Sequence, residues 1–225
     1  GIFGGEATYP AFPIAPRKVY IEMGAYVPLD KLPADIQELF SYNFPKAKQM
    51  LADAGYPNGF KASIIGQNKD ADQMQMVKAY WKDVGVDLEI QLKEPAVFAS
   101  IQTQHTYPEL LFSAGSGTYP TNLMNYLSTD WHNYSDYTGP EMSPKALELD
   151  EVYFEEKEVG RVFSEFAPHL YRLALYTGMP QGFGYGFWQP WVQNYHGENS
   201  VGNSEAPSFV RYIWVDMDMK KALGK

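Results

Sequence analysis

Segments with a helical period alternate with short apolar runs through the middle of the chain. The pattern predicts helices at 45–54, 71–84 and 95–104 and strands at 61–66, 86–92 and 109–113. Strands that alternate with helices usually pair in parallel, so this order predicts an α/β fold with a mixed, partly parallel sheet flanked by helices. We expect strands 61–66 and 86–92 to be neighbours, with helix 71–84 packed across them.

The first predicted helix has start and stop signals in its sequence. Asn43 can accept a hydrogen bond from a free backbone N–H group, and Pro45 suits the first turn. Gly55 supplies the left-handed residue after the last turn, and Pro57 prevents the helix from resuming. The expected apolar face of this helix comprises Ala47, Met50, Leu51 and Ala54. In helix 71–84, the residues expected to face the core are Met76, Ala79, Tyr80 and Val84.

The flanking parts of the chain have weaker patterns. Residues 1–35 are rich in proline and lack a period, which indicates an extended connection. Ser143 and Pro144 are typical of a helix start, and the apolar spacing predicts one long helix from there to Pro168. We expect a strand at 209–215 and a short helix at 216–223. These elements divide the chain into an extended connection at 1–42, an α/β lobe at 43–205, and a C-terminal strand and short helix at 206–225.

Composition narrows the possible functions. The chain has 225 residues, enough to bury a full core, and no cysteine, which excludes disulfides, thiolate nucleophiles and zinc–thiolate sites. Its net charge of −9 and the absence of a basic stripe argue against nucleic acid as a partner. No run of about 18 apolar residues predicts a membrane span.

Catalytic and metal-binding motifs are not recognisable in the sequence. The four histidines, His105, His132, His169 and His196, fall in different elements without a ligand spacing, although a metal site built from distant ligands stays an alternative. The acidic residues between 148 and 158 fit a solvated helix face better than a catalytic carboxylate pair. We therefore predict a binding protein rather than an enzyme, with no metal and no cofactor.

The first helix lies within a longer segment, YNFPKAKQMLADAGYPNGF at 42–60. Two later segments accompany it, GVDLEI at 85–90 and WVQNYHG at 191–197. In this order they resemble the Y-N-P-x-K-A-K-x-L-L-x-x-A-G-Y-P-x-G-F, G-I-x-V-x-I and P-x-V-x-G-Y segments of the family 5 extracellular solute-binding proteins, the dipeptide- and oligopeptide-binding receptors of bacterial ABC importers. The resemblance implies a periplasmic-binding-protein-like type II lobe. It also leads us to expect that Gly1 is not a native N-terminus and that this is the C-terminal portion of a longer chain.

The resemblance also implies a function. Such receptors close two lobes around a small solute by hinge motion and deliver it to a membrane permease. The implied partners are a peptide or other small-molecule ligand, the permease subunits and an N-terminal lobe of the same protein, and the implied location is extracytoplasmic, either periplasmic or on the cell surface as a lipoprotein. Aromatic residues form 16% of the chain and gather in its loops, so an oligosaccharide-binding protein that stacks sugars on these rings is the alternative. A hydrolase would need a nucleophile and a base in contact.

The loop at 111–123, LFSAGSGTYPTNL, is the expected wall of the binding cleft. In peptide-binding relatives this loop tends to read G-W-x-x-D-x-x-D-P-x-x-F, and the resemblance implies that its Trp lines the cleft and its first Asp pairs with the peptide ammonium group. Alignment on Pro120 places Ser113, Ser116 and Tyr119 at the Trp and the two Asp positions. A hydroxyl cannot replace a carboxylate charge, so we expect little preference for a free amino terminus. The predicted ligand-binding residues are Ser113, Gly115, Ser116, Tyr119, Asn122, Trp131 and Trp188.

Overall fold

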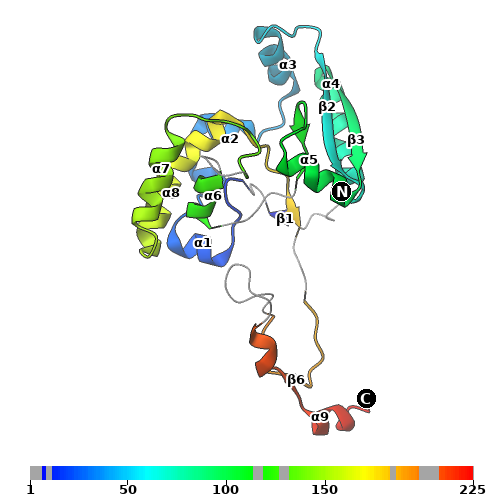
Figure 1. Ribbon diagram of the computed structural model, residues 1–225, viewed down its shortest axis with the longest axis vertical. Helices are drawn as coiled ribbons and strands as arrows, with labels where there is room; N and C mark the ends of the chain where they lie inside the picture. Colours follow the sequence, from blue (N-terminus) through cyan, green and yellow to red (C-terminus); the bar gives the residue numbers. More distant parts are fainter. Residues whose placement is uncertain are drawn as a thin grey trace. The chain divides into compact units, whose positions relative to one another are not determined.

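The computed structural model describes residues 7–8, 12–113, 119–126, 132–182, 186–197 and 208–224 (Figure 1). The chain divides into two compact units, Gly1–Gly182 and Phe183–Lys225. The first unit contains a sheet layer at residues 44–111 and a helical layer. The helical layer is built chiefly from the helices at 18–23, 120–126, 142–151 and 156–173.

The sheet layer has three parallel strands in the order β3-β2-β4. Its strands are β2 (Phe60–Gln67), β3 (Val86–Lys93) and β4 (Leu110–Leu111). β2 pairs with β3 from Phe60 opposite Val86 to Gln67 opposite Lys93, and β4 pairs with the other edge of β2. The prediction of neighbouring parallel strands is confirmed.

Three helices accompany these strands, and one short 3-10 turn, η2 (Asn68–Asp70), precedes the second of them. They are α3 (Phe44–Asp53), α4 (Ala71–Val84) and α5 (Pro95–Thr103). The Asn43 side chain accepts a hydrogen bond from the Lys46 N–H group, 3.2 Å away, and Gly55 has a φ of 94°. Both predicted signals of the first helix are therefore confirmed.

The buried faces of α3 and α4 differ from the expected ones. On α4, Met74 is fully buried and Val77, Trp81 and Val84 pack against the sheet core, whereas Met76, Ala79 and Tyr80 are exposed. On α3, Leu51 packs against that core, while Met50 and Ala54 are exposed. Two apolar stripes overlap on α4, and the stripe that faces the sheet passes through Met74. The Met74 side chain lies directly over Gly66, since a Cβ atom on Gly66 would be 2.5 Å from the Met74 Sδ atom.

The helical layer begins in the N-terminal part of the chain, so the expected extended connection there is wrong for residues 12–42. This part contains α1 (Lys18–Met23), the 3-10 turn η1 (Leu29–Lys31) and α2 (Ala34–Leu39). Ile14, Tyr20 and Met23 are buried in the helical core, and Ile36 is buried beside Tyr171. Each piece is too short to show a period in the sequence, yet α1 buries two side chains and α2 buries one.

The rest of this layer comprises α6 (Pro120–Tyr126), α7 (Met142–Glu151) and α8 (Glu156–Leu173). The single long helix expected from Ser143 to Pro168 is therefore two helices, and the second continues past Pro168. Ser143 does not cap α7, which begins one residue earlier. The break at 152–155 lets α7 and α8 pack against each other, so that Leu149 and Phe163 are buried in one core. A continuous helix could not fold back on itself to make this contact.

The remaining elements are short. β1 (Ala7–Thr8) pairs antiparallel with β5 (Gln181–Gly182) in the first unit. The second unit contains β6 (Val192–Gln193), η3 (Ser208–Tyr212), β7 (Trp214–Val215) and α9 (Met217–Ala222). Most of the strand expected at 209–215 is thus a 3-10 helix. The expected terminal helix is confirmed, and its cap is Asp216, which accepts from the Met219 N–H group at 2.9 Å. None of the described side chains in this unit is fully buried.

Candidate ligand-binding site

The three parallel strands end at one edge of the sheet, beyond Gln67, Lys93 and Leu111. Ligands of open α/β sheets bind outside the carboxyl ends of the strands. In Figure 1, β2 and β3 run from the end near α3 toward α5, which lies at this edge. We call this side of the sheet the carboxyl edge. The polar residues at the carboxyl edge are Gln67, Asn68, Lys93, Glu94, Gln102 and Ser113.

One polar contact joins the residues that follow β2 and β3. The Asn68 side-chain amide donates a hydrogen bond to the Glu94 carboxylate at 3.1 Å. Both side chains are exposed. The contact links the starts of the two connections that leave the sheet here.

A second polar contact joins α5 to the residue after β4. The Gln102 Nε2 group donates a hydrogen bond to the Ser113 hydroxyl at 2.8 Å, and both residues are partly buried. The strand ladder continues up to this point, because the Phe112 N–H group donates to the Ile65 carbonyl at 2.8 Å. Ser113 therefore lies beside Gln67, the last residue of the central strand.

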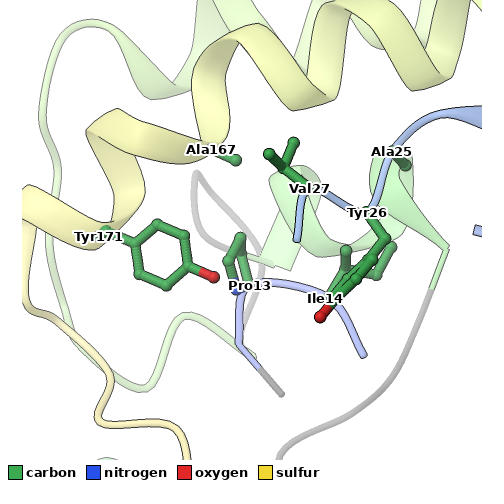
Figure 2. Close-up of a pocket in the computed structure, with 7 residues that line it drawn as sticks. All are labelled: Pro13, Ile14, Ala25, Tyr26, Val27, Ala167 and Tyr171. Carbon is green, nitrogen blue, oxygen red and sulfur yellow. The ribbon is translucent and has the colours of Figure 1, made fainter. Parts of the chain in front are cut away.

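Two hollows in the first unit lie away from the carboxyl edge. An open groove of about 300 Å³ lies at the opposite edge, where β2 and β3 begin, between Lys48, Tyr56 and Lys82. In the helical layer, a cavity of about 10 Å³ lies between Pro13, Tyr26 and Tyr171 (Figure 2). This volume is at the lower limit for a single water molecule, so it cannot hold a solute.

The structure describes four of the seven predicted ligand-binding residues. Ser113 is at the carboxyl edge. Tyr119 and Asn122 are partly buried at the start of α6, where the Leu123 N–H group donates to the Tyr119 carbonyl. Trp188 belongs to the second unit, where its ring centroid is 4.8 Å from that of Tyr195. Gly115, Ser116 and Trp131 lie outside the described residues.

The Tyr119 side chain packs against the helical layer and is not free in solvent. Its ring packs partly against the helical core, and its centroid is 5.7 Å from that of Tyr153. Burial raises the pKa of the Tyr119 hydroxyl, and the negative charge of Glu156 raises it further. This hydroxyl therefore stays protonated at neutral pH and can donate a hydrogen bond.

Two of the described histidines each lie beside a carboxylate. His169 Nε2 lies 2.9 Å from Glu141 Oε1, which also accepts from the Tyr137 hydroxyl, and His105 Nδ1 lies 2.6 Å from Asp136 Oδ1. The hydrogen bond from His169 is the largest cause that lowers the pKa of Glu141. Within the described ranges, no group of three or more histidine, aspartate or glutamate side chains could hold a metal ion. The same ranges contain no helix long and apolar enough to cross a membrane.

Sequence reasoning missed Gln102, Asn68 and Glu94. Gln102 lies inside a helix, and its partner in the structure is eleven residues away across a turn. The available signal was positional, because each strand of a parallel sheet ends at the binding edge and the polar residues just beyond predicted strands 61–66 and 86–92 were therefore candidates.

Residues 4–137 match the family model described as bacterial extracellular solute-binding proteins, family 5 Middle. This match covers more than half of the chain. The chain belongs to this family. No curated protein matches it.

Solved structures of periplasmic binding proteins share the fold. DppA from Helicobacter pylori, in complex with the peptide STSA, aligns over 62% of this chain and 29% of its own, with 21% identity and a TM-score of 0.53. MppA, a periplasmic murein tripeptide-binding protein in its unliganded open form, aligns over 68% and 31%, with 20% identity and a TM-score of 0.53. A dipeptide-binding protein from Pseudoalteromonas sp. SM9913, in complex with Met-Leu, aligns over 70% and 32%, with 18% identity and a TM-score of 0.50.

The chain thus spans about a third of the length of each of these structures. The predicted fold class is confirmed: the chain has the mixed α/β architecture, with a parallel sheet flanked by helices, of a periplasmic-binding-protein lobe.

Proposed function

We propose that this chain forms part of the solute-binding component of an ABC importer and supplies one wall of a cleft that captures a peptide or a related small solute. The observation that carries the proposal is the match of residues 4–137 to the solute-binding family. Its location would be extracytoplasmic, and its partners would be the permease subunits and a second lobe that closes on the same solute.

The carboxyl edge supports this role. It presents hydrogen-bonding side chains from three separate segments, which follow β2, β3 and β4. A cleft that must release its cargo needs polar groups that can exchange water for ligand, and it does not need a nucleophile beside a base. Membership of a family of solute-binding proteins also favours binding over catalysis.

A calorimetric panel tests the proposal. The longest natural protein that contains these 225 residues is titrated with Met-Leu, trialanine, tetraalanine and mannotriose. We expect micromolar or tighter binding of at least one peptide. No binding of any member would contradict the proposal, and binding of mannotriose alone would replace the peptide with an oligosaccharide.

The 225-residue chain serves as the matched comparison in the same titrations. A solute held between two lobes makes only part of its contacts with one of them, so the shorter chain should bind much more weakly than the longer one. Equal affinity would mean that the binding site is complete within this chain, which contradicts capture between two lobes.

The panel can also include N-acetylated trialanine, because Ser116 and Tyr119 replace carboxylates in the aligned loop. We propose that acetylation changes the affinity little. Ser116→Asp should then favour the free amine by about 1–3 kcal/mol, the usual range for a hydrogen bond between charged groups. Strong discrimination against the acetylated peptide by the unmodified protein would mean that another acidic residue binds the ammonium group.

A further inference from the structure

We propose that the Ser113 hydroxyl donates a hydrogen bond to an acceptor oxygen of the bound solute, and that Gln102 positions this hydroxyl. The solute would therefore turn a carbonyl, carboxylate or hydroxyl oxygen, and not an ammonium group, toward Ser113. This inference rests on the proposed function, since it names the chemistry that the same wall recognises.

The hydrogen bond between Gln102 and Ser113 has a direction that leaves one group of Ser113 available. Gln102 donates and Ser113 accepts, at 2.8 Å. A hydroxyl has one proton and two lone pairs, so a hydroxyl that accepts from an amide keeps its own proton for another acceptor. Among the described residues, Gln102 is the one partner that the Ser113 hydroxyl has. The bond from Gln102 also limits rotation of the hydroxyl, which reduces the entropy lost when a ligand binds.

The neighbouring residues add donors to the same wall. Gln67 lies opposite Lys93 in the strand register, and the ladder bond from Phe112 places Ser113 on the other side of Gln67. Adjacent residues of parallel strands in register point to the same face of the sheet. Lys93 is partly buried and forms no ion pair with any residue that the structure describes.

This set of groups discriminates between solutes. An ammonium group has three donors and no acceptor, so it would leave the Ser113 proton unpaired and would face the positive charge of Lys93. A carbonyl or carboxylate oxygen accepts from Ser113, and a carboxylate is also attracted by Lys93. Glu94, the carboxylate at the same edge, already accepts from Asn68 at 3.1 Å. The preference for an acceptor oxygen therefore belongs to the Ser113 and Lys93 positions and not to the whole edge.

Two substitutions test the positioning role. Ser113→Ala removes the donor, and Gln102→Glu converts the partner from a donor into an acceptor, so that the Ser113 hydroxyl turns its proton toward Glu and away from the solute. The probe is the tightest binder of the peptide and mannotriose panel, titrated into the longest natural protein. We expect each substitution to weaken binding about 3–30-fold, as for the loss of one hydrogen bond in a closed site.

Further variants separate positioning from charge and from folding. Gln75→Glu adds the same charge at an exposed position of α4 and should leave the affinity unchanged. Ser113→Thr keeps the hydroxyl and should bind within about twofold of the unmodified protein. In the double variant, Gln102→Glu should add little to Ser113→Ala, because its effect acts through the Ser113 proton.

Each outcome decides one of the two proposals. Unchanged affinity in Ser113→Ala or in Gln102→Glu would overturn this inference and leave the proposed function standing. Full additivity in the double variant would also overturn it, since Gln102 would then act without Ser113. If the unmodified protein binds no member of the panel, the proposed function fails and this inference fails with it.

Discussion

The sheet layer and the helical layer of the first unit bury their cores in different ways. The buried residues of the sheet core all come from one stretch of chain, between Ala62 and Leu88. The helical core joins Ile14, near the start of the unit, to Leu170, near its end. The sheet layer thus gains its core from local contacts, whereas the helical layer must close long loops before its core can form.

The two layers should therefore respond separately to loss of a core side chain. Phe163 is fully buried in the helical core, and Phe163→Ala should lower the free energy of unfolding by about 3–5 kcal/mol. Leu88 is the matched residue of the sheet core, fully buried as well, and Leu88→Ala should cost about 2–5 kcal/mol. Urea denaturation measures both values.

Hydrogen exchange then locates the damage. Phe163→Ala should accelerate amide exchange in α8 and α1 more than in β2 and β3, and Leu88→Ala should do the reverse. Equal acceleration in both layers by either variant would show that the two layers unfold as one cooperative unit.

The contact between α8 and α1 in the helical layer can be tested by adding one methyl group at Gly160. A Cβ atom on Gly160 would lie 1.9 Å from the Met23 carbonyl oxygen, where α8 crosses the end of α1. On an open helix surface, alanine is about 1 kcal/mol more favourable than glycine. We expect Gly160→Ala to destabilise the protein instead, by about 1–3 kcal/mol. Ser164→Ala on the same helix is the control and should change the free energy of unfolding by less than about 0.5 kcal/mol. A stabilising effect of Gly160→Ala would mean that α1 does not pack against α8 in this way.

The local signals of the sheet layer should have smaller effects. Asn43→Ala removes the cap of α3 and should cost about 1 kcal/mol in free energy of unfolding, whereas Asn43→Ser keeps a capping oxygen and should cost only a few tenths. Thermal or urea unfolding of both variants measures the difference. An equal loss of unfolding free energy in the two variants would show that the Asn43 side chain stabilises the protein by packing and not by capping α3.

A pH-dependent effect concerns a contact between the sheet layer and the segment that precedes α7. The Tyr107 hydroxyl donates to the Tyr134 carbonyl, and burial, followed by the charge of Asp136, raises the pKa of Tyr107 to about 12 from an ordinary value of 10.0. Because the folded pKa is the higher one, this contribution to stability is complete below pH 10 and is lost as the pH rises toward 12. Tyr107→Phe should therefore flatten the fall of unfolding free energy between these pH values, as measured by urea titrations. An unchanged dependence of the unfolding free energy on pH in Tyr107→Phe would mean that other groups cause the fall.

Sequence patterns predicted the sheet layer because its information is local. Asn43, Gly55 and the apolar runs at β2 and β3 each act within a few residues, and the parallel pairing follows from their alternation with helices. The buried face of α4 was misassigned because two apolar stripes compete on one helix, and only the contact of Met74 with Gly66 decides between them.

The helical layer and part of the site could not be predicted in this way. The break between α7 and α8 depends on how Leu149 and Phe163 reach a shared core, and α1 and α2 are too short for periodicity to identify. Ser113 was identified from the family loop, yet its partner Gln102 becomes visible only once α5 is placed at the carboxyl edge.

Two glycines at the beginning of the parallel pair limit where this chain can be engineered. A Cβ atom on Gly59 would lie 1.8 Å from the Gly85 carbonyl oxygen, and both residues have positive φ. The Phe60 N–H group donates to that same carbonyl, so the two strands start from one fixed point. One inserted residue in either turn would shift every side chain of a strand to the opposite face. Affinity tags, fluorescent inserts and permuted termini should therefore be kept away from these two turns, even though the turns lie at the surface.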